Sequence, residues 1–110
     1  MSALPCNTEA ESVESVAPMS FIRICAIFGN GDILAGEKLL RAIANRLLHA
    51  RAKHPVFAEG VYQGLSRITS EHDELVRAVE HETPERQQDE VLDVLATSVR
   101  FANKEYAFSS

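Results

Sequence analysis

Apolar residues recur at steps of three and four residues along most of this chain, which is the spacing of one face of an α-helix. This periodicity predicts three helices: one over residues 33–53, one from just after Pro55 to about His81, and one from Pro84 to about Tyr106. Because the connections between them are short, the sequence predicts an all-α fold, an antiparallel helical bundle. Three such helices are too thin to cover both sides of the central pair, so we expect oligomerisation to complete the bundle.

Residue types at the segment ends agree with these limits. Asp32 is the expected N-cap of the first helix, and Thr83 followed by Pro84 is typical of an N-cap and a first helical residue. The stretch Phe21–Phe28 is rich in Ile and Phe, and its length fits either a short strand or a helical turn. Within it, Cys25 is expected to be a buried small hydrophobic residue.

The chain has 110 residues, which is enough for one domain but not for two independent cores. Residues 1–18 contain Glu but no Lys or Arg, and they lack an apolar run. They are therefore expected to form a flexible acidic tail rather than a secretory signal. Residues 19–110 are expected to form a single helical domain.

Charge and cysteine usage exclude several classes of function. With 16 Asp and Glu against 11 Lys and Arg, the net charge of −5 has the wrong sign for binding a nucleic-acid backbone. The most apolar stretch is too short to cross a bilayer, so no membrane partner is expected. Cys6 and Cys25 have neither zinc-ligand spacing nor a disulfide framework, which favours a cytoplasmic location.

The candidate functional residues are acidic side chains that lie outside the apolar seams. Glu71 and Glu74 share one face of the second helix, beside the small residues Gly60, Gly64 and Ala78. The third helix has a polar stripe with acids first and cations last, made of Glu90, Asp93, Thr97, Arg100 and Lys104. If the two helices pack antiparallel, the acid pair of one faces the acid pair of the other.

Four carboxylates that converge in this way repel one another unless a cation lies between them. All-oxygen ligands favour Mg²⁺ or Mn²⁺, and Mg²⁺ typically binds carboxylates together with substrate phosphates. Arg100 and Lys104 are expected to contact the phosphate oxygens, although cations near a helix C-terminus also fit a purely structural role. The arrangement suits attack of water on a phosphoanhydride, with Glu71 or Glu74 as the catalytic base.

The pattern Glu71-x-x-Glu74, followed after fifteen residues by Glu90-x-x-Asp93, resembles the MazG-like all-α nucleotide pyrophosphohydrolases, whose signature is E-E-x-x-E and then E-x-x-D. The likeness covers residues 54–106. It implies that Mg²⁺ on these four acids hydrolyses a nucleoside triphosphate to the monophosphate and pyrophosphate, in a homodimer or homotetramer. Ser70 stands where the family has its first acid, which implies fewer or weaker metal sites.

Two other classes of function fit the same residues. Ser70 suits a degenerate helical protein that binds a nucleotide or a metal without efficient turnover. Alternatively, the acids only solubilise a structural helical protein. The second helix has a seam of period seven that favours self-association under every interpretation, and it consists of Val61, Leu65, Ile68, His72, Leu75 and Val79. His72 is expected to be a packed core histidine within this seam.

Overall fold

The computed structural model describes residues 18–107, so the predicted acidic tail lies outside the described residues apart from Pro18. Within this range the chain is all-helical, with no strand, which confirms the predicted class. The helices are α1 (Phe21–Phe28), α2 (Ile33–Lys53), α3 (Val61–His81) and α4 (Pro84–Ala102). No helix in residues 18–107 combines the length and apolarity needed to span a membrane.

The described chain divides at Glu37 into two compact units, and the first contains α1 and the start of α2. The Asp32 side chain accepts a hydrogen bond of 3.0 Å from the Ala35 backbone N–H, which confirms Asp32 as an N-cap. Cys25 is buried, as expected, and its carbonyl group lies so close to Gly36 that a Cβ atom there would overlap it. The ambiguous Phe21–Phe28 stretch is thus a helix that packs against the first turn of α2.

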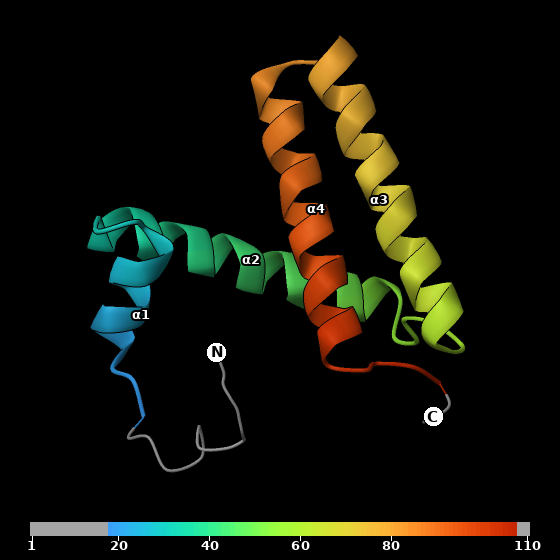
Figure 1. Ribbon diagram of the computed structural model, residues 1–110, viewed down its shortest axis with the longest axis horizontal. Coiled ribbons are helices and arrows are strands. Elements are labelled where there is room, and N and C mark those ends of the chain that lie inside the picture. The colour runs from blue at the N-terminus through green and yellow to red at the C-terminus, as the bar shows by residue number, and fades with distance from the viewer. Residues whose placement is uncertain (1–17, 108–110) are drawn as a thin grey trace, which may run out of the picture. The chain divides into compact units, whose positions relative to one another are not determined.

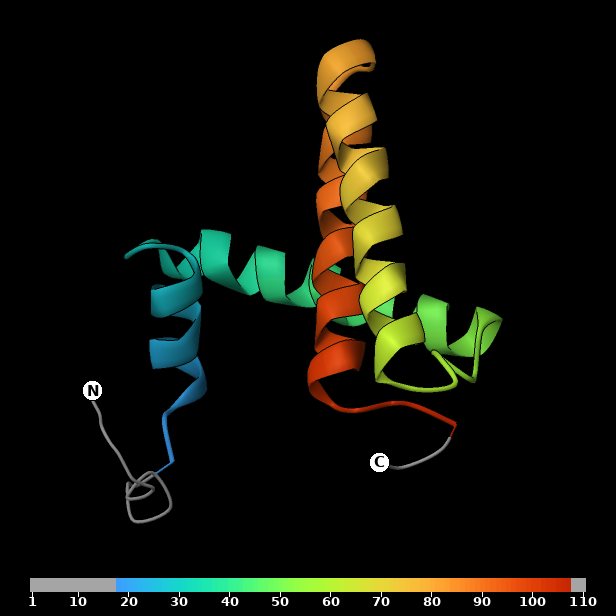
Figure 2. The same ribbon diagram turned by 45° about the vertical axis from the view of Figure 1, so that its right-hand side comes forward.

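In the second unit, α3 and α4 form an antiparallel hairpin (Figures 1 and 2). The predicted end of α3 at His81 and the predicted start of α4 at Pro84 are both confirmed. Thr83 caps α4, since its hydroxyl accepts a hydrogen bond of 3.3 Å from the Arg86 backbone N–H. This short turn fixes the register in which the two helices face each other.

Small residues let the two helices approach closely. Gly64 and Ala78 are buried on the face of α3 that packs against α4. A Cβ atom on Gly64 would lie 2.9 Å from the Phe101 ring and 3.0 Å from the Tyr106 ring, so a larger residue would force these rings to move. Glu71 lies midway between Gly64 and Ala78 at seven-residue spacing, and this packing therefore directs Glu71 toward α4.

The predicted end of the third helix near Tyr106 is wrong, because α4 ends at Ala102. Lys104 has a φ of 56°, and this left-handed conformation terminates the helix. The chain after it pairs with the segment before α3, where the Ala107 N–H donates a 2.7 Å hydrogen bond to the Ala58 carbonyl. The Tyr106 ring packs with its centroid 5.9 Å from that of Phe101.

The predicted apolar seam of α3 is largely exposed in this chain. Val61, Leu65 and Val79 are 42%, 51% and 58% exposed. The prediction of a core histidine is also wrong, since the His72 side chain is 65% exposed. The reason is that α4 packs on the neighbouring face of small residues, which permits a closer approach than the seam does.

Candidate metal centre

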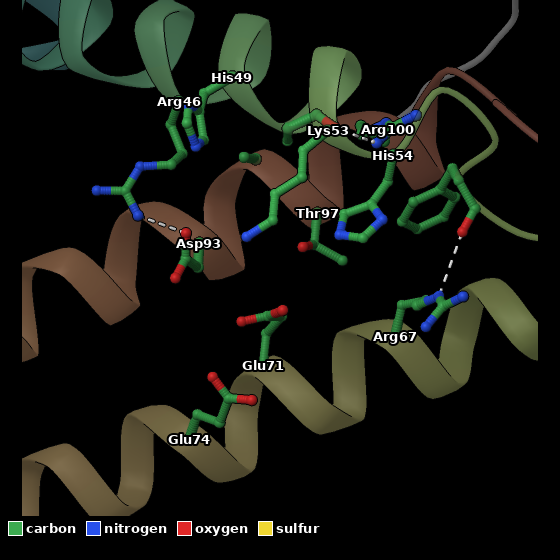
Figure 3. A pocket seen from close by; sticks show the side chains of 13 residues that line it. Arg46, His49, Lys53, His54, Arg67, Glu71, Glu74, Asp93, Thr97 and Arg100 are labelled. Carbon is green, nitrogen blue, oxygen red and sulfur yellow. Dashed lines mark hydrogen bonds and ion pairs between the residues drawn. The ribbon is translucent and has the colours of Figure 1, made fainter.

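Three carboxylates from two helices meet at the centre of the α3–α4 pair. Glu71 comes from α3, and Glu90 and Asp93 come from α4. One carboxylate oxygen of each lies within 4.8 Å of the others. Glu74 is exposed and lies outside this group of three, but it is directed from α3 toward the same space (Figure 3). The structure thus brings together three of the four predicted ligands and places the fourth beside them.

The electrostatics of the group reflect its crowding. Burial raises the pKa of Glu71 to about 7, and the negative charges of Glu74, Asp93 and Glu90 add to this effect, while Arg46 opposes it. Burial is also the main cause that raises the pKa of Glu90, with Asp93 and Glu74 contributing. These acids therefore resist being charged at the same time unless a cation compensates them.

Two carboxylate oxygens of the group are buried without a partner. Among the described residues, neither Oε1 of Glu71 nor Oε1 of Glu90 has a hydrogen-bond donor. Glu90 is only 6% exposed, so solvent water has little access to supply the missing donor. A buried acceptor without a partner costs about 1–3 kcal/mol, and more when it is charged. A bound cation would satisfy both oxygens at once.

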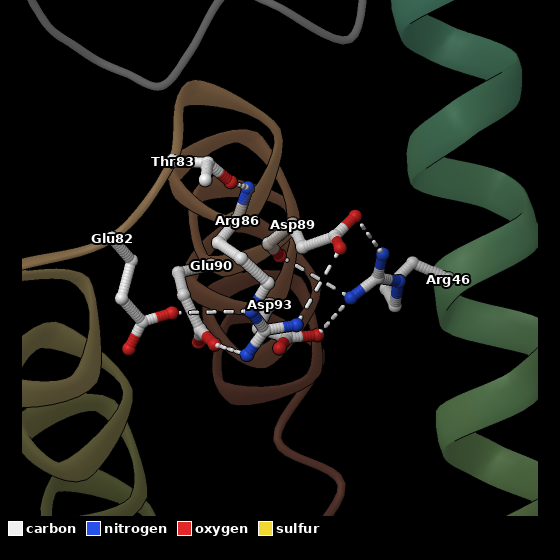
Figure 4. Close-up of polar contacts among 7 residues, drawn as sticks. All are labelled: Arg46, Glu82, Thr83, Arg86, Asp89, Glu90 and Asp93. Carbon is white, nitrogen blue, oxygen red and sulfur yellow. Dashed lines mark hydrogen bonds and ion pairs between the residues drawn. The ribbon is translucent and has the colours of Figure 1, made fainter. Parts of the chain in front are cut away.

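Two arginines that the sequence analysis did not single out bind the outer side of the group (Figure 4). Arg46 of α2 donates hydrogen bonds to the Asp93 carboxylate and, at 3.2 Å, to the Asp89 carbonyl. Arg86 Nη2 donates to Glu90 Oε2 at 2.8 Å. The four-residue spacing of Arg86 and Glu90 is a detectable helical ion pair, whereas Arg46 is distant in sequence and gave no local signal.

A cavity of about 690 Å³ opens beside the carboxylates. Glu71, Glu74 and Asp93 line one side of it (Figure 3). Nitrogen-bearing side chains contributed by α2 and the residue after it also line the cavity, namely Arg46, His49, Lys53 and His54. The volume falls in the range that holds a small organic ligand, which is about 300–1,000 Å³.

The two predicted phosphate-binding cations have different surroundings. Arg100 borders the cavity, but it is only 4% exposed and its Nε donates to Glu105 Oε1 at 2.8 Å. Its guanidinium also lies 5.3 Å from the centre of the Phe57 ring. Lys104 is exposed in the turn after α4 and is not among the residues that line the cavity. The structure therefore brings Arg100, but not Lys104, to the cavity, and most of the Arg100 donors are engaged within the protein.

Comparisons of the chain with models of known protein families, with curated proteins and with solved structures found no match. The likeness to the MazG-like enzymes thus remains a prediction from the spacing of the acids.

The first prediction concerns Glu71→Gln in the absence of metal. Because the pKa of Glu71 is raised in the folded protein, the metal-free protein loses stability as the pH rises from about 4.5 through about 7. Removing this charge should therefore raise the free energy of unfolding by about 2 kcal/mol at pH 8, and by much less at pH 5.

Urea unfolding in the presence of a chelator measures this difference. Asp73→Asn is a matched control on the same helix, since the Asp73 side chain is 66% exposed and lies outside the group. A Glu71→Gln protein that is no more stable than the Asp73→Asn protein at pH 8 would show that burial and the neighbouring charges do not destabilise the charged form of Glu71.

A second prediction concerns Glu105, whose pKa is lowered to about 2, chiefly by its hydrogen bond with Arg51 and also by that with Arg100. A lowered pKa gives stability that is present above about pH 4.5 and is lost as the pH falls toward 2. Glu105→Gln should therefore cost on the order of 2 kcal/mol at pH 7. The gap between wild type and variant, measured by urea unfolding, should close progressively below pH 4.5. A gap that is independent of pH would contradict this role.

Proposed function

We propose that this protein hydrolyses a nucleoside triphosphate to the monophosphate and pyrophosphate with the help of Mg²⁺ or Mn²⁺. The observation that supports it most is the buried Glu90 carboxylate, whose Oε1 has no partner in the described chain and which lies against Glu71 and Asp93. The spacing of these acids in the sequence, with its resemblance to MazG-like enzymes, supplies the reaction class.

The residues present fit a hard divalent cation. Glu71, Glu90 and Asp93 would hold it, since all three offer carboxylate oxygens and two of these oxygens are otherwise unsatisfied. A cation held by these residues would supply Lewis acidity for cleavage of a phosphoanhydride. Ser70 is exposed beside Glu71, so the chain offers no fifth carboxylate at the position where the family has one.

Residues around the three ligands supply the proton acceptor and hold one ligand in position. Glu74 is exposed, borders the cavity and lies outside the group of three, so we assign it the role of catalytic base that accepts a proton from the attacking water. The water oxygen forms a bond to the α-phosphorus, the α–β phosphoanhydride bond breaks, and pyrophosphate leaves with the electron pair of that bond. Arg46 holds the Asp93 carboxylate from the α2 side and so positions it.

The test is release of pyrophosphate from a panel of ribonucleoside and deoxyribonucleoside triphosphates with Mg²⁺, with Mn²⁺ and with a chelator. Metal-dependent release is expected from wild type. Asp93→Asn should lower the rate by about 100-fold, because a lost ligand weakens metal binding strongly. Asp73→Asn should retain the wild-type rate, and circular dichroism should show unchanged helicity in both variants.

Equal rates in wild type and Asp93→Asn would remove the proposed centre. If the wild type releases no pyrophosphate from any substrate but metal still raises its melting temperature, the protein is instead a binding protein without turnover. If there is no pyrophosphate release and metal does not change the melting temperature, the protein is a structural helical protein.

We also propose that the functional unit is a homodimer or a homotetramer. The exposed face of α3 that includes Val61, Tyr62, Leu65 and Val79 supports this, since exposure of so many large apolar residues on one helix is unfavourable in water. Sedimentation velocity should give two or four times the mass of one chain, and Leu65→Glu should shift the protein toward monomer. A monomeric wild type would contradict the proposal.

A further inference from the structure

One face of α2 carries three nitrogen-bearing side chains that the proposed chemistry has not fully used. They are Arg46, His49 and Lys53, and we call them the basic row. Their spacing of three and then four residues places them on one side of the helix. All three line the cavity, and Figure 3 shows the Lys53 side chain extending from α2 into it, toward the carboxylates.

The helix dipole does not by itself account for this row. Cations are favoured in the last turn of any helix, and Lys53 is the last residue of α2. Arg51 is in the same turn, but its guanidinium binds Glu105, with Nη2 and Oε2 2.6 Å apart. The dipole favours both residues equally and does not explain why Lys53 faces the cavity.

The acids that line the same cavity do not form ion pairs with every residue of the basic row. Arg46 is engaged, since it binds Asp93 and Asp89. His49 and Lys53 have no carboxylate within ion-pair distance among the described residues. The cavity thus has donors on its α2 side that remain available, beside a group of acids that would be neutralised by a divalent cation.

We propose that the basic row binds the polyphosphate chain of the substrate, on the phosphoryl oxygens that the metal leaves uncoordinated. This inference rests on the proposed function for the metal-bound end of the chain. The Lys53 ammonium and the His49 ring N–H would each donate to a phosphoryl oxygen, and these charge-assisted bonds are the stronger kind. Arg46 would add a donor from the position where it already binds Asp93.

The length of the row sets the class of ligand. Arg46 and Lys53 are seven residues apart, so the row extends for about 10 Å along the helix axis. That length exceeds one phosphoryl group, and the row therefore suits a chain of several. Affinity should fall in the order inorganic tripolyphosphate, pyrophosphate, phosphate.

The test uses the full chain with Mg²⁺, inorganic tripolyphosphate as the probe, and isothermal titration calorimetry as the readout. Lys53→Met should weaken binding of tripolyphosphate by about tenfold, and adding His49→Gln should weaken it further. Lys38→Met is the matched control, because Lys38 is an exposed lysine of α2 outside the cavity, and it should bind as wild type does. In the hydrolysis assay, Lys53→Met should raise KM by about tenfold and change kcat by less than about twofold.

The outcomes separate this inference from the proposed function. If wild type hydrolyses a nucleoside triphosphate and Lys53→Met has the same KM and the same affinity for tripolyphosphate, the basic row is overturned and the function stands. If wild type hydrolyses nothing but binds tripolyphosphate through Lys53, the function is overturned and the row stands. Absence of tripolyphosphate binding by wild type with Mg²⁺ overturns the row in either case.

Discussion

The cost of holding charged carboxylates between α3 and α4, first through burial and then through their mutual repulsion, is the constraint on which the rest of the site depends. Packing of α4 against the small residues Gly64 and Ala78 brings Glu71 within a few ångströms of two acids of α4, and burial of Glu90 removes most of the water that would screen them. A fold that needed only stability would place apolar side chains here, because buried charges are costly. The cation that we propose for this site would offset that cost.

Charged residues around the cavity fall into two groups according to whether they already have partners. Arg51 of α2 and Arg100 of α4 both donate to the Glu105 carboxylate and so link the end of α2 to the end of α4. Lys53 and His49 face the cavity without a carboxylate partner in the described chain. The cations with a carboxylate partner and those that we propose to bind phosphate thus lie only a few residues apart in sequence, and only their contacts distinguish them.

The features that the sequence predicted correctly are those set by local interactions. The caps at Asp32 and Thr83 depend on a side chain and a backbone N–H three residues away, so residue type alone identifies them. The spacing of the acids on α3 and α4 follows from helix geometry in the same way, and a short turn between the two helices was enough to predict that their acids would face each other.

The features that the sequence missed depend on which face of a helix another segment covers. His72 lies in an apolar seam, but α4 packs against the face of small residues beside that seam. The His72 side chain is therefore exposed. Tyr106 continues the helical period of α4, but pairing of the chain with Ala58 ends the helix earlier. Arg46 and Lys53 belong to a helix whose position against α4 no local pattern reports.

The most direct test of the central claim is a crystal structure of the protein grown with Mn²⁺, with an anomalous difference map that locates the ion. The account predicts a peak within bonding distance of carboxylate oxygens of Glu71, Glu90 and Asp93, close to the distance of about 2.0–2.1 Å that is typical of Mg²⁺. An ordered structure with these three side chains in place, and with no peak among them, would contradict it.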